Sequence, residues 1–172
     1  MIRATHHLKR QDRKDAPFDT VVLAHDERHL RRKLLRLQHG HEVLVDLPEP
    51  VMLEHGDVLV LEDGRQAEII AAEEELYSVA AGSALHLTVL AWHLGNRHLP
   101  AQIEEGRILI LRDRVIMAML EGLGARVTET TEPFHPTRGA YHSHDSHSHA
   151  HEPGNHHSHE NGHSHSAHHH HD

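Results

Sequence analysis

The chain has 172 residues, including 25 histidines but no cysteine, and its formal net charge is −9 when every histidine is counted as neutral. The absence of thiols excludes disulfides, thiolate metal sites and a cysteine nucleophile, so a transition-metal site must use His, Asp, Glu, Met or backbone groups. With one Trp, two Tyr and two Phe, the chain offers few aromatic platforms for stacked bases, and nucleic acid is not an expected partner.

The N-terminal segment MIRATHHLKRQDRKD lacks the apolar run of a signal peptide. No later segment approaches the roughly 20 apolar residues of a membrane span. We therefore expect a cytoplasmic protein that does not enter a membrane.

The first part of the chain, residues 1–75, contains short apolar runs separated by turn signals, which predicts a β-rich domain. The expected strands are residues 20–24, 34–37, 43–47, 58–61 and 67–71. His39-Gly40-His41 and Asp63-Gly64-Arg65 are typical of tight hairpins, and the strand spacing favours a small antiparallel sandwich or barrel.

Residues 76–138 alternate between strand and helix patterns. Strands are predicted at residues 76–79, 101–103, 107–111 and 126–130, with helices at residues 84–94 and 115–124. Ser83 and Asp113 are the expected N-caps of the two helices. The order βαββαβ is that of a ferredoxin-like domain, and the expected fold class is α+β.

Composition changes abruptly after Arg138. Residues 139–172 lack Leu, Ile, Val, Phe, Lys and Arg, so burial cannot offset the cost of ordering the backbone, about 1 to 2 kcal/mol per residue. We expect a disordered tail.

The repeated His-X-His and His-His units of this tail predict binding of divalent transition metals through imidazole. The candidate ligands are His142, His144, His147, His149, His151, His156, His157, His159, His163, His165, His168, His169, His170 and His171. Imidazole suits Ni²⁺, Cu²⁺ and Zn²⁺ and does not by itself choose among them. A purification tag and a pH-responsive solubilising segment are the alternatives, although the Ser, Asp, Glu and Asn between the histidines are unlike a uniform tag.

A further candidate ligand lies in the segment AWHLGNRHLP, where His98 follows the Gly95-Asn96 break after the first helix. A loop histidine can present a ring nitrogen to solvent or to a second subunit, and a solvated surface histidine is the alternative. His93 is a weaker candidate, because it shares the helix with Leu90 and Leu94.

The stretch from Trp92 to Pro100, followed by Gln102-Ile103, resembles UreE, the urease accessory nickel metallochaperone family. The upstream hairpins, the βαββαβ order and the His-rich end agree with this resemblance, which covers residues 1 to about 138. It implies a peptide-binding-like first domain and a ferredoxin-like second domain that dimerises. It also implies that His98 from two subunits converges on one Ni²⁺, with water or tail histidines completing the site.

The implied function is delivery of nickel to the urease active site through complexes with the GTPase UreG and other accessory proteins, without enzymatic activity. Some relatives carry a further His-X-His where this chain has Arg112-Asp113-Arg114, so secondary metal sites are not expected there.

The remaining histidines are interpreted as structural or solvated, with His135 left open because it lies where the fold meets the tail. A protein that stores or detoxifies nickel or zinc is the alternative function. An enzyme is not favoured, since the sequence has no evident nucleophile–base pair or phosphate-binding glycine loop.

Overall fold

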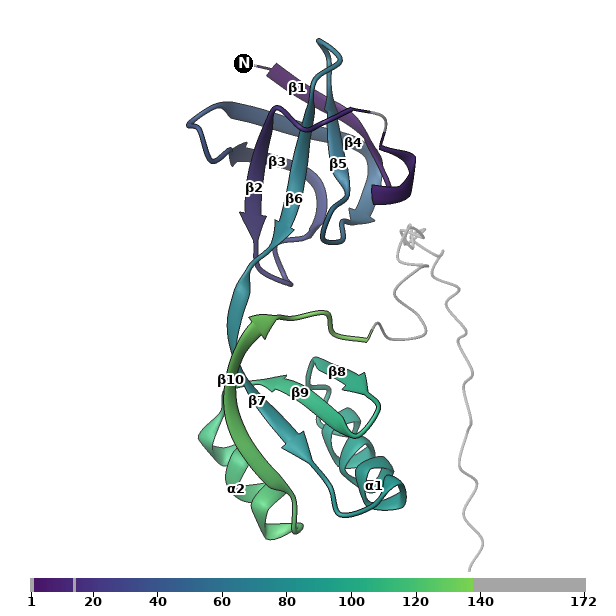
Figure 1. Ribbon diagram of the computed structural model, residues 1–172, viewed down its shortest axis with the longest axis vertical. Coiled ribbons are helices and arrows are strands. Elements are labelled where there is room, and N and C mark those ends of the chain that lie inside the picture. The colour runs from purple at the N-terminus through teal and green to yellow at the C-terminus, as the bar shows by residue number, and fades with distance from the viewer. Residues whose placement is uncertain (1, 14, 138–172) are drawn as a thin grey trace, which may run out of the picture. The chain divides into compact units, whose positions relative to one another are not determined.

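The computed structural model describes residues 2–13 and 15–137, which form two β-sheets and two helices (Figure 1). The first sheet contains β1 (Ile2–Leu8), β2 (Asp19–Leu23), β3 (His29–Arg36), β4 (Glu42–Met52), β5 (Val58–Leu61) and β6 (Gln66–Ala71), with a 3₁₀ turn at Arg10–Asp12. The second part contains β7 (Glu73–Ala80), α1 (Ala84–Gly95), β8 (Ala101–Glu104), β9 (Arg107–Leu111), α2 (Arg114–Gly122) and β10 (Arg126–Pro133).

The first sheet has the strand order β2-β6-β5-β1-β4-β3 and is mixed. The β3–β4 and β5–β6 pairs are the expected antiparallel hairpins. However, β1 pairs in parallel with β4, and β2 pairs in parallel with β6. The expectation of a wholly antiparallel sheet was therefore wrong: the unpredicted strand β1 lies between β4 and β5, and β2 lies at the edge of the sheet beside β6.

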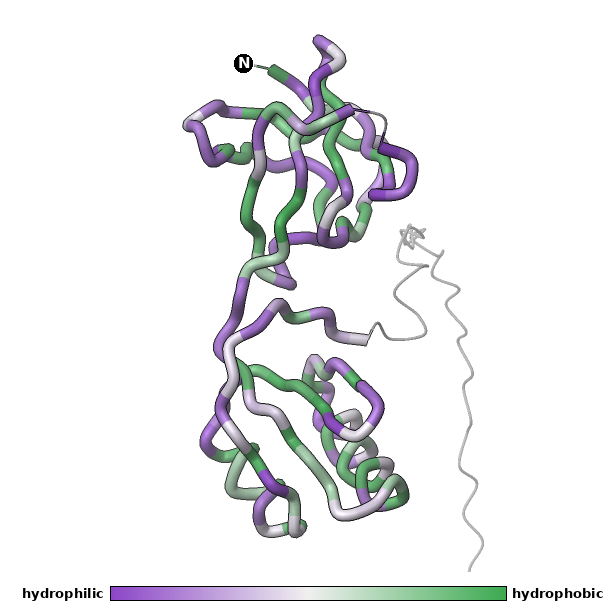
Figure 2. The backbone as a smooth tube through the Cα atoms, viewed as in Figure 1, coloured by the Kyte–Doolittle hydropathy of each residue, from purple (hydrophilic) through white to green (hydrophobic). Residues whose placement is uncertain are grey.

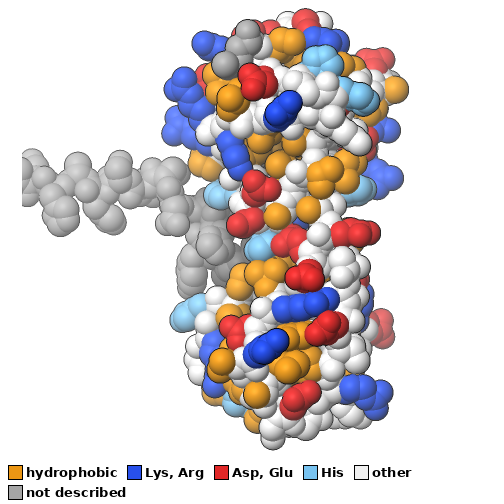
Figure 3. Space-filling view, turned by 90° about the vertical axis from the view of Figure 1, so that its left-hand side faces the viewer, with side chains coloured by type: hydrophobic (Ala, Val, Ile, Leu, Met, Phe, Trp, Pro, Cys, Tyr) orange, Lys and Arg blue, Asp and Glu red, His pale blue; other side chains and the backbone are white. Residues whose placement is uncertain are grey.

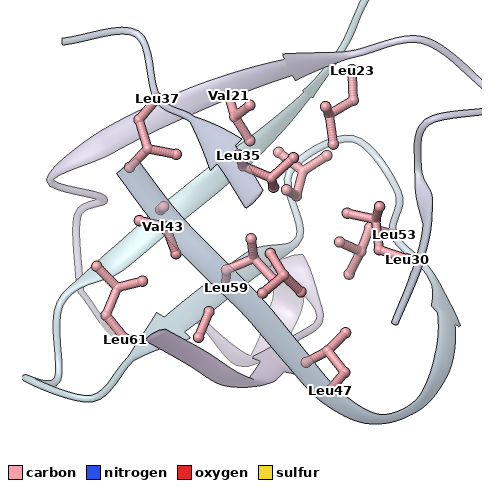
Figure 4. Close-up of a cluster of buried hydrophobic side chains, with 14 residues drawn as sticks. Val21, Leu23, Leu30, Leu35, Leu37, Val43, Leu47, Leu53, Leu59 and Leu61 are labelled. Atoms are coloured by element: carbon pink, nitrogen blue, oxygen red, sulfur yellow. The ribbon is translucent and has the colours of Figure 1, made fainter. Parts of the chain in front are cut away.

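The core of this sheet consists of aliphatic side chains from several strands. Val21, Leu35, Val43 and Leu59 come from β2, β3, β4 and β5 and point toward one another (Figure 4). Complete burial of one such side chain contributes about 1.5–3 kcal/mol to stability. Alternating burial along β2, β4 and β6 reflects the two-residue period of a strand with one face in the core.

The second sheet has the order β10-β7-β9-β8, and all its strand pairs are antiparallel. This order, with α1 and α2 in the two crossovers, is the predicted ferredoxin-like βαββαβ arrangement. The α+β class is confirmed. The boundaries at residues 75/76 and 138/139 stay predictions.

The helices of the second part begin where the sequence predicts. Ser83 Oγ accepts a hydrogen bond from His86 N at 3.1 Å. Asp113 Oδ1 accepts from Val115 N at 2.7 Å and from Ile116 N at 3.0 Å. Leu90 and Leu94 of α1 and Leu120 of α2 are buried in one core with residues of β7 and β9. Figure 2 shows β9 as a nearly continuous hydrophobic segment, as its sequence RILIL requires.

Among the described residues, neither helix is long and apolar enough to cross a membrane. On the face drawn in Figure 3, acidic and basic side chains are interspersed with apolar ones.

Candidate metal centre

His98 lies in the turn that ends α1. The His98 N–H donates to Gly95 O at 3.0 Å, and the Leu99 N–H reaches back to Leu94 O at 3.4 Å. These two bonds form a Schellman motif, in which the residue at the position of His98 adopts positive φ and is usually glycine. His98 has φ 55° and is the one non-glycine residue with positive φ in the described part of the chain.

The two leucines next to this turn fix it to the core. Leu94 is fully buried and Leu99 packs against the same cluster, which is the apolar contact that usually accompanies a Schellman motif. His98 itself is exposed, and within residues 2–13 and 15–137 its imidazole makes no hydrogen bond. A side chain held at a strained backbone position, with its ring free, is available to coordinate an ion.

An apolar face of α1 lies just before this turn. Leu85, Val89 and Trp92 follow one another at helical spacing, with 75%, 43% and 63% of their surfaces exposed. Leu90 and Leu94, on another side of the helix, are buried. The helix is therefore apolar on the surface as well as toward the core, which is typical of a helix that contacts a further partner.

Contacts within the fold also occupy His93, Arg112 and Asp113. The ring of His93 packs edge-on against Trp92, with 5.0 Å between ring centroids. Arg112 forms ion pairs with Glu75 at 3.5 Å and Glu129 at 3.1 Å. Asp113 is occupied as the N-cap of α2, as predicted.

His135, which the sequence left open, is hydrogen-bonded on two sides. Its Nδ1 lies 3.1 Å from Nη1 of Arg28, and its main-chain N–H donates to Gln102 Oε1 at 2.7 Å. Because a guanidinium only donates, Nδ1 of His135 is the acceptor. Burial lowers the pKa of His135, and the charge of Arg28 lowers it further. His135 is therefore a neutral hydrogen-bond acceptor for Arg28.

The predicted tail ligands, His142 to His171, lie outside the described residues. Within residues 2–13 and 15–137, no group of three or more His, Asp or Glu side chains is arranged to enclose a metal ion. In this part of the chain, His98 therefore does not belong to a group of three or more such side chains.

Sequence reasoning missed a second arrangement of histidines, in the β3–β4 hairpin. Nδ1 of His39 lies 2.8 Å from Oδ1 of Asp19, and Nδ1 of His41 lies 2.9 Å from Oδ2 of the same residue. The turn sequence His-Gly-His could have suggested paired rings. The carboxylate could not be found in this way, because Asp19 lies twenty residues before His39 in the sequence.

Fold and site together define a two-sheet α+β protein with an exposed histidine at the end of a partly unburied helix. Residues 1–72 match the family described as UreE urease accessory protein, N-terminal domain, and residues 74–172 match its C-terminal domain. The chain belongs to the UreE family of urease accessory proteins, which are not enzymes.

Proteins with the name urease accessory protein UreE are similar to this chain over most of their own length. The protein of Rhizobium rhizogenes is 60% identical over 87% of this chain and 89% of its own length. The proteins of Agrobacterium fabrum and Rhizobium meliloti are each 58% identical, with 92% and 96% of their own lengths covered.

Proposed function

We propose that this protein is a cytoplasmic nickel metallochaperone that delivers Ni²⁺ for assembly of the urease metallocentre. The recipients in this proposal are the urease apoprotein and its accessory complex, reached through the GTPase UreG. Membership of the urease accessory family supports the recipient, and the chemistry of the His98 turn supports the cargo.

The observation that carries the proposal is the position of His98. A glycine at this point of the Schellman motif would remove the cost of positive φ, which is on the order of 1 kcal/mol. An imidazole here is therefore unfavourable for local stability. The presence of histidine at this position is explained if its ring nitrogen serves as a metal ligand.

A single imidazole holds an ion weakly, and a second copy of the chain supplies the missing donor. In a two-fold symmetric dimer the same surface meets itself, so a residue close to the axis lies near its own copy. The exposed apolar face of Leu85, Val89 and Trp92 supports such a contact. We therefore propose a homodimer in which the two His98 side chains share one Ni²⁺.

Transfer in this proposal proceeds by ligand exchange. Two imidazoles fixed by the fold, with water or tail histidines in the remaining positions, release an ion more readily than a closed cage would. The tail histidines collect ions and raise their concentration near His98. The same donors accept Zn²⁺ and Cu²⁺, and copper is the strongest competitor by the Irving–Williams order.

Replacement of His98 by Gly tests this function, because it removes the imidazole while it suits the turn. We expect the variant to fold at least as stably as the parent and to retain most of its bound nickel on the tail. Its rate of nickel-dependent activation of the urease apoprotein, with the accessory proteins present, should fall by about tenfold or more.

The matched control for this experiment is His29→Asn, which removes an exposed imidazole from β3. The control should activate urease at the parental rate. An undiminished rate in the His98→Gly variant would show that His98 is not the transfer ligand, and would favour metal storage on the tail as the function.

A further inference from the structure

The side chain of Asp19 at the start of β2 has no solvent contact. Its Oδ1 accepts hydrogen bonds from Thr20 N at 2.8 Å and from His39 N at 3.3 Å. The Nδ1 atoms of His39 and His41 donate to Oδ1 and Oδ2 respectively. Both carboxylate oxygens thus accept hydrogen bonds, and the side chain faces the two imidazoles and not the solvent.

The hairpin is held in this position by its backbone. Gln38 N donates to Thr20 O at 2.8 Å, and Leu37 N donates to His41 O at 2.8 Å. Gly40, with φ 87°, provides the left-handed turn between the two histidines. The His41 ring also contacts Phe18, with 5.2 Å between ring centroids. The two imidazoles are therefore oriented before any ligand arrives.

The contact with Asp19 also determines the tautomer of each ring. A carboxylate only accepts hydrogen bonds, so Nδ1 of His39 and Nδ1 of His41 both carry hydrogen. In the neutral rings the lone pair is then on Nε2. The His39 and His41 side chains are 70% and 46% exposed, so these rings are accessible from solvent.

A histidine that donates Nδ1–H to a carboxylate and coordinates through Nε2 is the usual arrangement of an imidazole metal ligand. We propose that His39 and His41 bind one divalent transition-metal ion through Nε2, with Asp19 as the residue that orients both rings. Water completes the coordination, since two protein donors are present. This site lies in the first sheet and does not depend on the function proposed for His98.

The positive charge of Arg65, which contacts the Phe18 ring beside His41, is balanced by an acid. Arg65, which lies over the Phe18 ring at 4.1 Å from its centroid, is paired with Asp63 through Nε and Oδ2 at 2.8 Å.

A purely structural role, in which the two rings only satisfy a buried carboxylate, explains the same hydrogen bonds. The readings differ in whether the Nε2 atoms bind metal.

Labelling of imidazole nitrogens with diethyl pyrocarbonate, read residue by residue by peptide mass spectrometry, separates the two readings in the full chain. Ni²⁺ is added in increasing amounts beyond saturation of the tail histidines. We expect Ni²⁺ to slow the labelling of His39 and His41 at least fivefold, with one shared midpoint. His6 and His7 of β1, which share no carboxylate, are the internal control and should label at an unchanged rate.

Two variants test whether Asp19 orients the rings and whether the two rings share one ion. Asp19→Asn should raise the nickel midpoint by tenfold or more, and His39→Gln should remove the protection of His41. A circular dichroism spectrum like that of the parent shows that each variant is folded. If Asp19→Asn fails to fold, the His39→Gln result decides alone.

The proposal is overturned if His39 and His41 label equally fast with and without Ni²⁺. It is also overturned if they are protected only together with His6 and His7, or if His41 stays protected in the His39→Gln variant.

Discussion

Asp19 has an unusual environment for a carboxylate, because it is buried and yet remains charged. Burial raises its pKa, but hydrogen bonds from His41, Thr20 and His39 outweigh this effect and lower the pKa far below the ordinary value of 3.8. A group whose pKa is lower in the folded state stabilises the fold above its unfolded pKa. That contribution is lost as the pH falls through the folded pKa.

Asp19→Asn should accordingly destabilise the protein by about 3 kcal/mol at pH 7, because it removes a charged acceptor of several hydrogen bonds. The difference from the parent should shrink as the pH falls below about 4, where the unfolded carboxylate becomes protonated. Urea denaturation midpoints of the parent and the variant at pH 7, 5 and 3 measure this difference in stability. An exposed acid, Asp63→Asn, is the control with a smaller effect, and a pH-independent difference for Asp19→Asn would contradict the assignment.

Among single residues, the sequence reveals those whose role depends on neighbours along the chain. Ser83 and Asp113 are recognisable as N-caps because each precedes an apolar helical pattern, and His98 stands out because it follows a glycine break. The partnership of Asp19 with His39 and His41 is not recognisable, since it depends on how β2 lies against a distant hairpin. The same holds for the pairing of Arg28 with His135.

Among the elements, α1 combines two apolar faces in 12 residues. Its Leu90 and Leu94 belong to the core, whereas Leu85, Val89 and Trp92 are exposed. Exposure of a large aromatic side chain beside two aliphatic ones is costly in a monomer and favourable at an interface. The helix therefore supports the proposed dimer contact.

Trp92→Glu should convert the proposed dimer into a monomer, because it places a charge in the centre of the proposed interface. Sedimentation velocity measures the change in mass. The matched control is Leu34→Glu, at an exposed apolar position of β3, which should remain dimeric. A Trp92→Glu protein with the mass of a dimer would show that subunits meet elsewhere.

Element prediction succeeded where hydrophobic periodicity was strong. Strands β5, β6 and β9 and both helices were predicted within a few residues of their observed bounds. Strand β1 was missed because only Ala4 of its seven residues is buried, so its sequence lacks an apolar pattern. Its place in the sheet comes from hydrogen bonds with β4 and β5, and these account for one of the two unexpected parallel pairs, β1 with β4.

At the level of the whole molecule, the described residues contain both principal cores, one in each sheet. A chain that ends at residue 138 therefore keeps the packing of both sheets and lacks the tail histidines. Such a chain separates the proposed His98 site from metal collection by the tail.

Native mass spectrometry of this shortened chain, loaded with Ni²⁺, tests whether two His98 side chains share one ion. Nickel bound at any other site in the fold is present in both the shortened parent and its His98→Gly variant, so it does not contribute to the difference between them. We predict that both proteins are dimers and that the variant carries one Ni²⁺ fewer per two chains. Equal nickel content in the two dimers, or the loss of one ion from each chain, would contradict the shared His98 site.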